Sequence, residues 1–276
     1  MKWIGRIVLA GVVLCVVAIA AFFAASEWVI RRPHAVAEES IVADRSDAGV
    51  REGERLAHVL SCLDCHGPQA QGRVLVNKPM LGILSAPGLA PLVRQASDAD
   101  LARTIRHGVR RNGATLWAMP ARIRLADDDT ARLIGYLRSL QPTPADLQER
   151  ADFGPVGRLQ ILRGQLEPSV RNKIVAPAHR PSDEGPYLVN LICLSCHDLY
   201  RSRPVGPVSV APPLAAMASA YDDKAFTRLM RTGVGLSPHD LGEMRVAAQT
   251  GFTHFTDPEI AAIKRYLTQA AAAAPN

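Results

Sequence analysis

The chain has 276 residues, enough for one large domain or two ordinary ones, and its 48% hydrophobic and 21% charged residues exclude a disordered protein. Its formal net charge of +6 comes without a long basic run, so we expect no nucleic-acid partner. Five cysteines are too few for a disulfide scaffold, and only 5% of residues are aromatic, so large core side chains are scarce.

The N-terminal segment predicts a membrane anchor. Ile7–Ala25 carries no charge, and as a helix it would be roughly 28 Å long, about one hydrocarbon core. The nearest small-x-small cleavage site, Ala35–Ala37, lies about ten residues beyond this stretch, farther than signal cleavage usually tolerates. We therefore expect residues 1–35 to form an uncleaved signal anchor with one transmembrane helix, and a removed signal peptide is the alternative.

Two copies of one short motif follow the anchor. Cys62–His66 is CLDCH and Cys193–His197 is CLSCH, so both are C-x-x-C-H with leucine after the first cysteine. Two such matches in a chain with 5 Cys and 8 His do not arise by chance. The remaining cysteine, Cys15, lies in the apolar N-terminal stretch, where we expect a small buried hydrophobic side chain.

The sequence downstream of each motif also repeats. Arg106–Val109 and Arg231–Val234 share Arg, Gly and Val in register, and a methionine stands eleven residues after each glycine, at Met119 and Met244. A Tyr-Leu pair then follows in the last helical pattern of each copy. This order indicates an internal duplication.

Helix signals agree with the duplication, and they place the boundaries. Ser97 before an acidic turn and the capping box Thr256–Glu259 predict helix starts in the two copies, and no convincing period-two strand is present. Six prolines forbid one long helix between the copies, where we expect a strap across both with at most a short helix. We expect an all-α fold with these divisions: anchor 1–35, first domain 47–141, interdomain strap 142–181 and second domain 182–271.

C-x-x-C-H is the attachment signature of c-type haem. Two thiols one turn apart are placed to form thioethers with the vinyl groups of one porphyrin, and the adjacent histidine becomes the proximal iron ligand. A thioredoxin-like site would need a βαβ context, and a zinc site would need cysteine pairs closer in sequence. We expect two covalently bound haem c groups, which would also supply the missing flat apolar core units: Cys62, Cys65 and His66 hold the first, and Cys193, Cys196 and His197 hold the second.

The sixth ligand of each iron has several candidates. Only Met119 and Met244 lie equally far from the paired Arg-x-Gly-Val patterns, so we expect them on the first and second iron. His/Met coordination leaves no open site and raises the potential, which suits electron transfer. The other candidates lack a counterpart in the opposite copy: Met80, His58 and His107 in the first, and Met217, Met230, His239 and His254 in the second.

Weaker candidates surround the histidines. In Pro212-Pro213-Leu214 a proline carbonyl is placed to accept the ring N–H of His197, and Pro87 or Pro91 would do the same for His66, although each proline is equally a loop breaker. Two residues that would either pair with haem propionates or face solvent are Arg106 and Arg231.

These residues together resemble a known pattern. Cys62–His66 with Met119-Pro120, and Cys193–His197 with Met244, each followed by Tyr-Leu, resemble class I cytochrome c twice. The whole body resembles membrane-anchored dihaem cytochromes c and is similar to the cytochrome subunits of bacterial membrane-bound alcohol and sugar dehydrogenases. The resemblance implies two tandem class I cytochrome c domains. It also implies a single-pass protein of the bacterial inner membrane with its haem domains in the periplasm.

The function expected from these features is electron transfer and not catalysis. The chain would pass single electrons between a dehydrogenase or other donor and the respiratory chain, with redox proteins, an oxidase or a quinone-linked complex as partners. A dihaem enzyme of the peroxidase or thiosulfate-oxidising type is the alternative. It would need an open or unusual sixth ligand, against which the matched methionines argue. A haem-bearing sensor or assembly factor is a third possibility, for which the sequence offers no signalling module.

Overall fold

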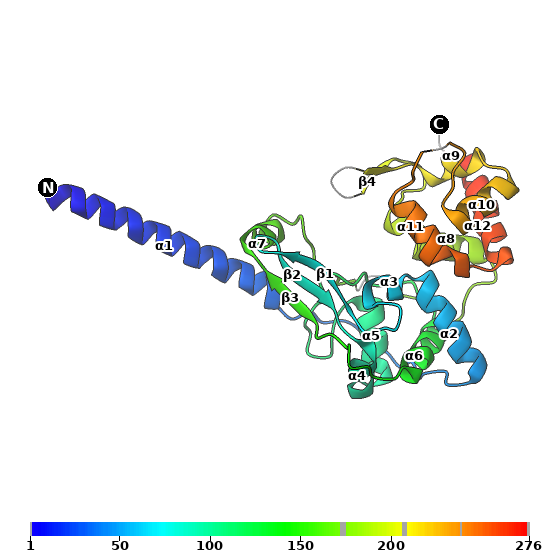
Figure 1. Ribbon diagram of the computed structural model, residues 1–276, viewed down its shortest axis with the longest axis horizontal. Helices are drawn as coiled ribbons and strands as arrows, with labels where there is room; N and C mark the ends of the chain where they lie inside the picture. The colour runs from blue at the N-terminus through cyan, green and yellow to red at the C-terminus, as the bar shows by residue number, and fades with distance from the viewer. Residues whose placement is uncertain (1, 172–174, 206–208, 238, 275–276) are drawn as a thin grey trace.

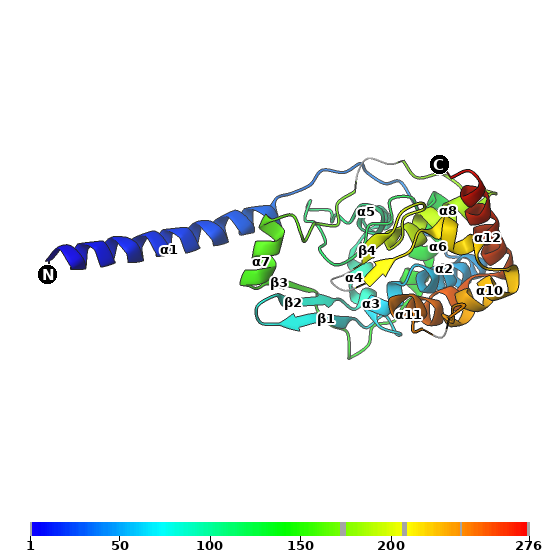
Figure 2. The same cartoon turned by 90° about the horizontal axis from the view of Figure 1, so that it is seen from above.

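A long N-terminal helix projects from one side of a helical body (Figures 1 and 2). The computed structural model describes residues 2–171, 175–205, 209–237 and 239–274. Among these residues α1 (Lys2–Arg31) is the one helix that is long and apolar enough to cross a membrane, with a mean hydropathy of 3.0 over its most apolar window. None of that window is buried by the rest of the chain, as expected for a segment that needs an apolar surrounding.

The body consists of two helical sets with the same order of elements. In each, a first helix leads into a C-x-x-C-H motif, and a short helix, a third helix and a final helix follow. The first set is α2 (Asp47–Val59), α3 (Cys62–His66), α4 (Leu89–Gln95), α5 (Asp98–His107) and α6 (Asp127–Ser139). The second set is α8 (Glu184–Leu191), η1 (Cys193–Ser195), α9 (Leu214–Ser219), α10 (Asp223–Thr232) and α12 (Asp257–Ala272), with α11 (Glu243–Thr250) and η2 (Phe252–His254) added before α12.

The first and final helices of each set cross at a glycine. A Cβ on Gly53 of α2 would overlap a backbone oxygen of α6 and lie 2.9 Å from the Cβ of Tyr136. A Cβ on Gly185 of α8 would overlap a backbone oxygen of α12 and lie 2.8 Å from the Cβ of Tyr266. Only glycine allows these backbones to approach so closely, and the same contact occurs in both sets.

An arginine of the third helix holds the start of the final helix in both sets. Arg106 donates to the carbonyl two residues before α6 and pairs with Asp127, the first residue of that helix. Arg231 makes the equivalent bonds to α12, where its Nη2 lies 2.6 Å from Asp257. These arginines therefore hold helix N-termini, and their pairing with haem propionates stays a prediction.

The expectation of an all-α chain is wrong in one respect, because two small antiparallel sheets are present. One has the order β1-β2-β3 and the other is a hairpin: β1 (Arg73–Lys78), β2 (Gly82–Ala86), β3 (Arg150–Phe153), β4 (Arg203–Val205) and β5 (Ser209–Ala211). The strands are only three to six residues long, and most residues of β1 are exposed. Their sequences therefore show no strict alternation of buried and exposed residues. The third strand also comes from the predicted strap, which local patterns do not reveal.

The strap contacts both helical sets, as expected, but most of it lies on the first. Leu147 and Ser169 donate backbone hydrogen bonds to residues of the first set at 2.8 Å, and β3 extends its sheet. Only the last part reaches the second set, where Arg180 pairs with Glu259 of α12 and with Glu52 of α2.

The strap also contains α7 (Pro155–Leu162), which packs beside the base of α1 (Figure 1). Arg158 donates to Ser26 at 2.9 Å and pairs with Glu27 at 2.8 Å. Below this contact Phe153 meets the edge of Trp117, with ring centroids 5.2 Å apart. The helix α1 is therefore fixed to the body by the polar contacts of Arg158 and by Val29 and Ile30, which pack against the cluster of Trp117, Phe153 and Ile161. A segment without helix separates α1 from α2.

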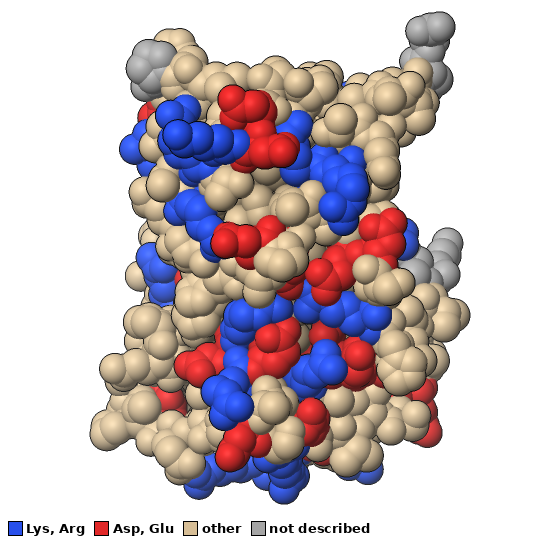
Figure 3. All heavy atoms as spheres, turned by 90° about the vertical axis from the view of Figure 1, so that its right-hand side faces the viewer, with Lys and Arg blue, Asp and Glu red and all other residues tan. Residues whose placement is uncertain are grey.

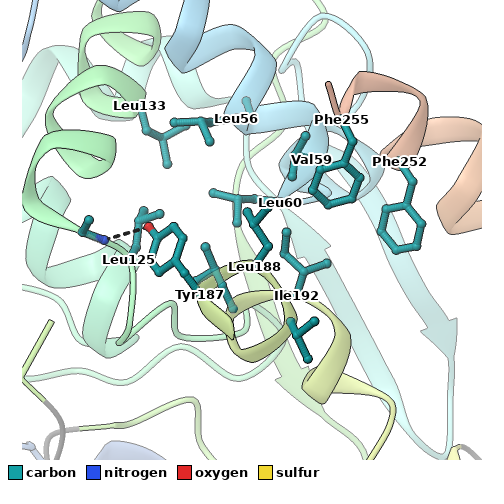
Figure 4. Close-up of a cluster of buried hydrophobic side chains, with 14 of the residues drawn as sticks. Leu56, Val59, Leu60, Leu125, Leu133, Tyr187, Leu188, Ile192, Phe252 and Phe255 are labelled. Atoms are coloured by element: carbon teal, nitrogen blue, oxygen red, sulfur yellow. Dashed lines mark hydrogen bonds between the residues drawn. The ribbon is translucent and has the colours of Figure 1, made fainter. Parts of the chain in front are cut away.

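One hydrophobic core runs through both sets (Figure 4). Side chains from the end of α2 meet those of α8 and η2, and the residues at this contact are Leu56, Val59, Leu60, Leu188, Ile192, Phe252 and Phe255. On the end of the body farthest from α1, basic and acidic side chains interleave and neither sign dominates (Figure 3).

Polar contacts at this interface are reciprocal. Arg55 of α2 bonds Glu259, the third residue of α12, at 2.8 and 3.0 Å. Tyr187 of α8 donates to Asp129, the third residue of α6, at 2.9 Å and accepts from the Ala126 N–H (Figure 4). Glu259 is 2% exposed and Asp129 is fully buried, so each final helix begins against the first helix of the other set.

Candidate haem-attachment sites

The first motif forms the short helix α3. Ser61 adopts a left-handed backbone conformation with a φ of 58°, which interrupts the helix between α2 and the motif. Cys62 and Cys65 are free thiols and partly buried, and His66 is 8% exposed. The His66 Nδ1 lies 2.9 Å from the carbonyl oxygen of Pro87.

The second motif is built in the same way. Cys193 and Cys196 are free, with Cys196 exposed, and His197 is partly exposed. The His197 Nδ1 lies 2.9 Å from the carbonyl oxygen of Pro212. A proline carbonyl therefore meets each histidine as expected, and among the prolines considered these are Pro212 for His197 and Pro87 for His66.

This geometry prepares both histidines to bind a metal through the other ring nitrogen. A carbonyl only accepts, so each Nδ1 carries the proton and each Nε2 keeps its lone pair. Burial lowers the pKa of His66, against the opposing effect of its bond to Pro87, so its ring is neutral near pH 7. Neutral imidazole is the form that coordinates iron.

The cysteines suit covalent attachment better than the alternative chemistries. Burial raises the pKa of Cys62 to about 11 and that of Cys193 to about 12, whereas a redox-active C-x-x-C depends on a lowered thiol pKa. Among the described residues no three His, Cys, Asp or Glu side chains come together as a metal cluster. The donor set of each motif, two free thiols and one oriented histidine, fits haem c.

The two expected methionine ligands lie in different local structures. Met119 is partly buried in the irregular segment between α5 and α6, while Met244 is partly buried in the first turn of α11. Both pack against the common core, and their binding to iron stays a prediction. Among the other candidates, Met80 is 58% exposed in the β1–β2 turn, and Met230 is 3% exposed inside the core.

Three of the other candidate histidines, His58, His107 and His254, have partners of their own. His107 uses both ring nitrogens, Nδ1 with the Arg171 carbonyl at 2.7 Å and Nε2 with Glu39 at 2.9 Å. His58 stacks on His254 with centroids 3.9 Å apart, across the contact between the two sets. His239 is exposed, and Met217 is partly buried in α9.

Sequence reasoning missed one residue beside the motifs. Arg122, between Met119 and α6, donates to the Leu60 carbonyl at 2.7 Å and to the Leu191 carbonyl at 3.3 Å. It lies outside the repeated pattern, so no comparison of the two copies brings it to notice.

Comparison with known proteins agrees with this geometry. Residues 48–137 match the family described as cytochrome C oxidase, cbb3-type, subunit III. Residues 48–137 form a c-type cytochrome domain. This cytochrome c domain covers most of α2 to α6 with the first motif, and it implies covalently bound haem c.

The chain is also similar to the gluconate 2-dehydrogenase cytochrome c subunit of Pantoea cypripedii. The two are 25% identical over 264 residues, which cover 80% of this chain and 59% of that protein. The chain thus spans about three fifths of the length of this relative. The similarity confirms the resemblance to dehydrogenase cytochrome subunits that the motifs indicate.

Proposed function

We propose that the chain is a membrane-anchored dihaem c-type cytochrome that passes single electrons between a dehydrogenase or other donor and the respiratory chain. The observation that carries this proposal is the repeated motif geometry. Both C-x-x-C-H motifs present free thiols beside a histidine whose Nδ1 is bonded to a proline carbonyl at 2.9 Å. The second motif thereby supports a second cytochrome c domain in residues 182–271.

Each motif has a defined task in this proposal. Bound haem c supplies an iron that alternates between the ferric and ferrous states. In the first domain Cys62 and Cys65 hold the porphyrin as thioethers, and His66 binds through Nε2 while Pro87 fixes its ring. Cys193, Cys196, His197 and Pro212 do the same in the second domain. The surrounding protein excludes water and sets the potentials.

Met119 and Met244 complete the proposed coordination. Both pack against the common core, as do Cys62 and Cys193, and a thioether ligand raises the reduction potential. We expect Met119→Ala and Met244→Ala each to lower the potential of one haem, measured by optical redox titration. Met80→Ala is the matched control, because this exposed side chain should leave both potentials unchanged. A shift in Met80→Ala instead would refute the register argument.

The proposal places α1 in the bacterial inner membrane and the haem domains in the periplasm. The unburied apolar helix and its fixed contact with α7 support an anchor. Anchoring would raise the effective concentration of the carrier near membrane partners. The name of the relative supports a dehydrogenase as the electron donor. Co-purification from solubilised membranes tests this partner, and recovery of the full chain in the soluble fraction would contradict the anchor.

An optical spectrum of the purified full-length protein in detergent tests the function itself. We expect two c-type haems per chain and, in the oxidised state, the weak far-red band of iron–thioether ligation. High-spin ferric haem or rapid binding of carbon monoxide by the reduced protein would indicate an open site. Such a result would overturn the carrier function and favour a dihaem enzyme of the peroxidase or thiosulfate-oxidising type.

A further inference from the structure

Arg122 connects equivalent positions of the two motifs. Its guanidinium donates to the carbonyls of Leu60 and Leu191, at 2.7 and 3.3 Å, and each leucine stands two residues before the first cysteine of a motif. Its own backbone is fixed, because its N–H donates to the Ile105 carbonyl at 2.8 Å. One side chain therefore joins the entrances of both haem-attachment segments.

The contact around Arg122 extends to the first motif itself. Thr250 at the end of α11 donates to the Asp64 carboxylate, inside the first motif, at 3.1 Å. The end of the second set's added helix therefore lies against the first motif, while Arg122 binds the segments that lead into both motifs.

The cation of Arg122 lies within electrostatic reach of both motifs. Burial is the largest effect on the pKa of its guanidinium and lowers it, and the groups near enough to oppose this effect when ionised are Cys62, Cys65 and Cys196, which belong to both motifs. No carboxylate contributes to the pKa shift of Arg122. In contrast, Glu259 raises the pKa of both Arg55 and Arg180. In the described residues the bonds of Arg122 go to two neutral carbonyls, and no Asp or Glu of the chain pairs with its charge.

We propose that Arg122 is a positioning residue shared by both haems, which ties the two C-x-x-C-H segments together and raises both haem potentials with one charge. This inference rests on the proposed dihaem function. A nearby cation disfavours the ferric state, which carries one more positive charge than the ferrous state. At an effective dielectric constant of about 20, a unit charge at about 12 Å changes an equilibrium constant roughly tenfold.

Two further arginines provide matched controls, because each contacts a single motif. Arg73 donates to the Asp64 carbonyl at 3.2 Å, and Arg203 donates to the Leu194 carbonyl at 3.0 Å. Both approach their motif from the strand that follows it, β1 and β4. Removal of either charge should act mainly on its own haem.

The test is a redox titration of the full-length, haem-loaded protein in detergent, followed optically. Arg122→Gln keeps amide donors for the two carbonyls but removes the charge, so both potentials should fall by up to about 59 mV, a tenfold change for one electron. Arg122→Lys keeps the charge, so both potentials should stay near those of the wild type. Arg73→Gln and Arg203→Gln should each lower one potential.

Three results would overturn the inference. The first is a change in the potential of only one haem in Arg122→Gln, and the second is unchanged potentials in that variant. The third is an equal change of the potentials in the Lys and Gln variants, which would indicate a packing effect. The haem count and carbon monoxide binding of the wild type are measured on the same preparation. Two haems with a closed site and unchanged potentials in Arg122→Gln would leave the proposed function intact and remove the role of Arg122.

Discussion

Replacing Glu259 by glutamine tests whether a buried ion pair holds the two helical sets together. The Glu259 side chain is 3% exposed and accepts from Arg55 at 2.8 and 3.0 Å and from the Thr256 N–H at 2.7 Å, and Arg180 pairs with it as well. Glutamine preserves the shape but leaves two guanidinium groups without their common anion. Removing one partner of a buried pair costs about 3 kcal/mol of unfolding free energy.

The magnitude leads to a measurable change. For domains of this size each kcal/mol lowers the melting temperature by about 2–4 °C, so Glu259→Gln should melt roughly 6–12 °C below the wild type. Urea unfolding of the full chain in detergent, followed by circular dichroism, measures the free energy directly. Asp152→Asn is the surface control, because Asp152 is 62% exposed, and its cost should stay within about 0.5 kcal/mol.

The pH dependence gives a second test of the same residue. Burial alone would raise the pKa of Glu259, but the bonds from Arg55 and Thr256 outweigh it and hold the pKa below the ordinary value of about 4.3. The stabilisation is therefore complete above that value and is lost as the pH falls through the lowered pKa. The difference between the wild type and Glu259→Gln should be largest at pH 7 and should shrink below about pH 4.

Asp129 offers the matched comparison, because it occupies the same position in α6. Burial is the largest effect on Asp129 and raises its pKa, so its ionisation opposes folding as the pH rises. Asp129→Asn should therefore cost clearly less than Glu259→Gln at pH 7. An equal loss in the two variants, or a cost below about 1 kcal/mol for Glu259→Gln, would refute the assignment of the interface to the Arg55–Glu259 pair.

Two further predictions concern packing. Gly53→Ala should lower the unfolding free energy by about 1–3 kcal/mol in the same urea assay, because the added methyl meets the backbone of α6, and a neutral effect would contradict the close crossing. Arg158→Ala should release the base of α1 from α7. The free energy of local opening should fall by about 1 kcal/mol, so proteolysis between residues 32 and 46 should become roughly fivefold faster. Arg163→Ala, on the exposed end of α7, should leave the cleavage rate unchanged.

Features encoded by neighbouring residues could be predicted from the sequence. Ser97 caps α5 by accepting from the Asp100 N–H at 3.1 Å, and Thr256 and Glu259 form the expected capping box. The C-x-x-C-H motifs directly follow the first helix in both sets, as the repeated order of sequence signals predicts. Short spacing is enough to specify caps and motifs.

Features that depend on distant partners could not be predicted. The strand β3, which lies in the strap, pairs with β2 of the first set. With four residues, three of them exposed, β3 is too short to show an alternating pattern. Arg122 lies 62 residues from Leu60 and 69 from Leu191, and the second copy has no equivalent arginine to mark it. Arg106 and Arg231 were visible as a pair, but only the packed structure shows that they bind the start of the next helix.

The matching contacts of Arg55 and Tyr187 have the form of an isologous interface, in which two halves present the same surface to each other. Two identical halves would give two identical haem environments and no preferred order of reduction. A single chain removes that restriction, since each half carries its own side chains at equivalent places. Here an ionised Glu259 faces arginine on one side, and an Asp129 of raised pKa faces tyrosine on the other. Covalent linkage thus keeps the symmetric contact while allowing the surroundings of the two C-x-x-C-H motifs to differ.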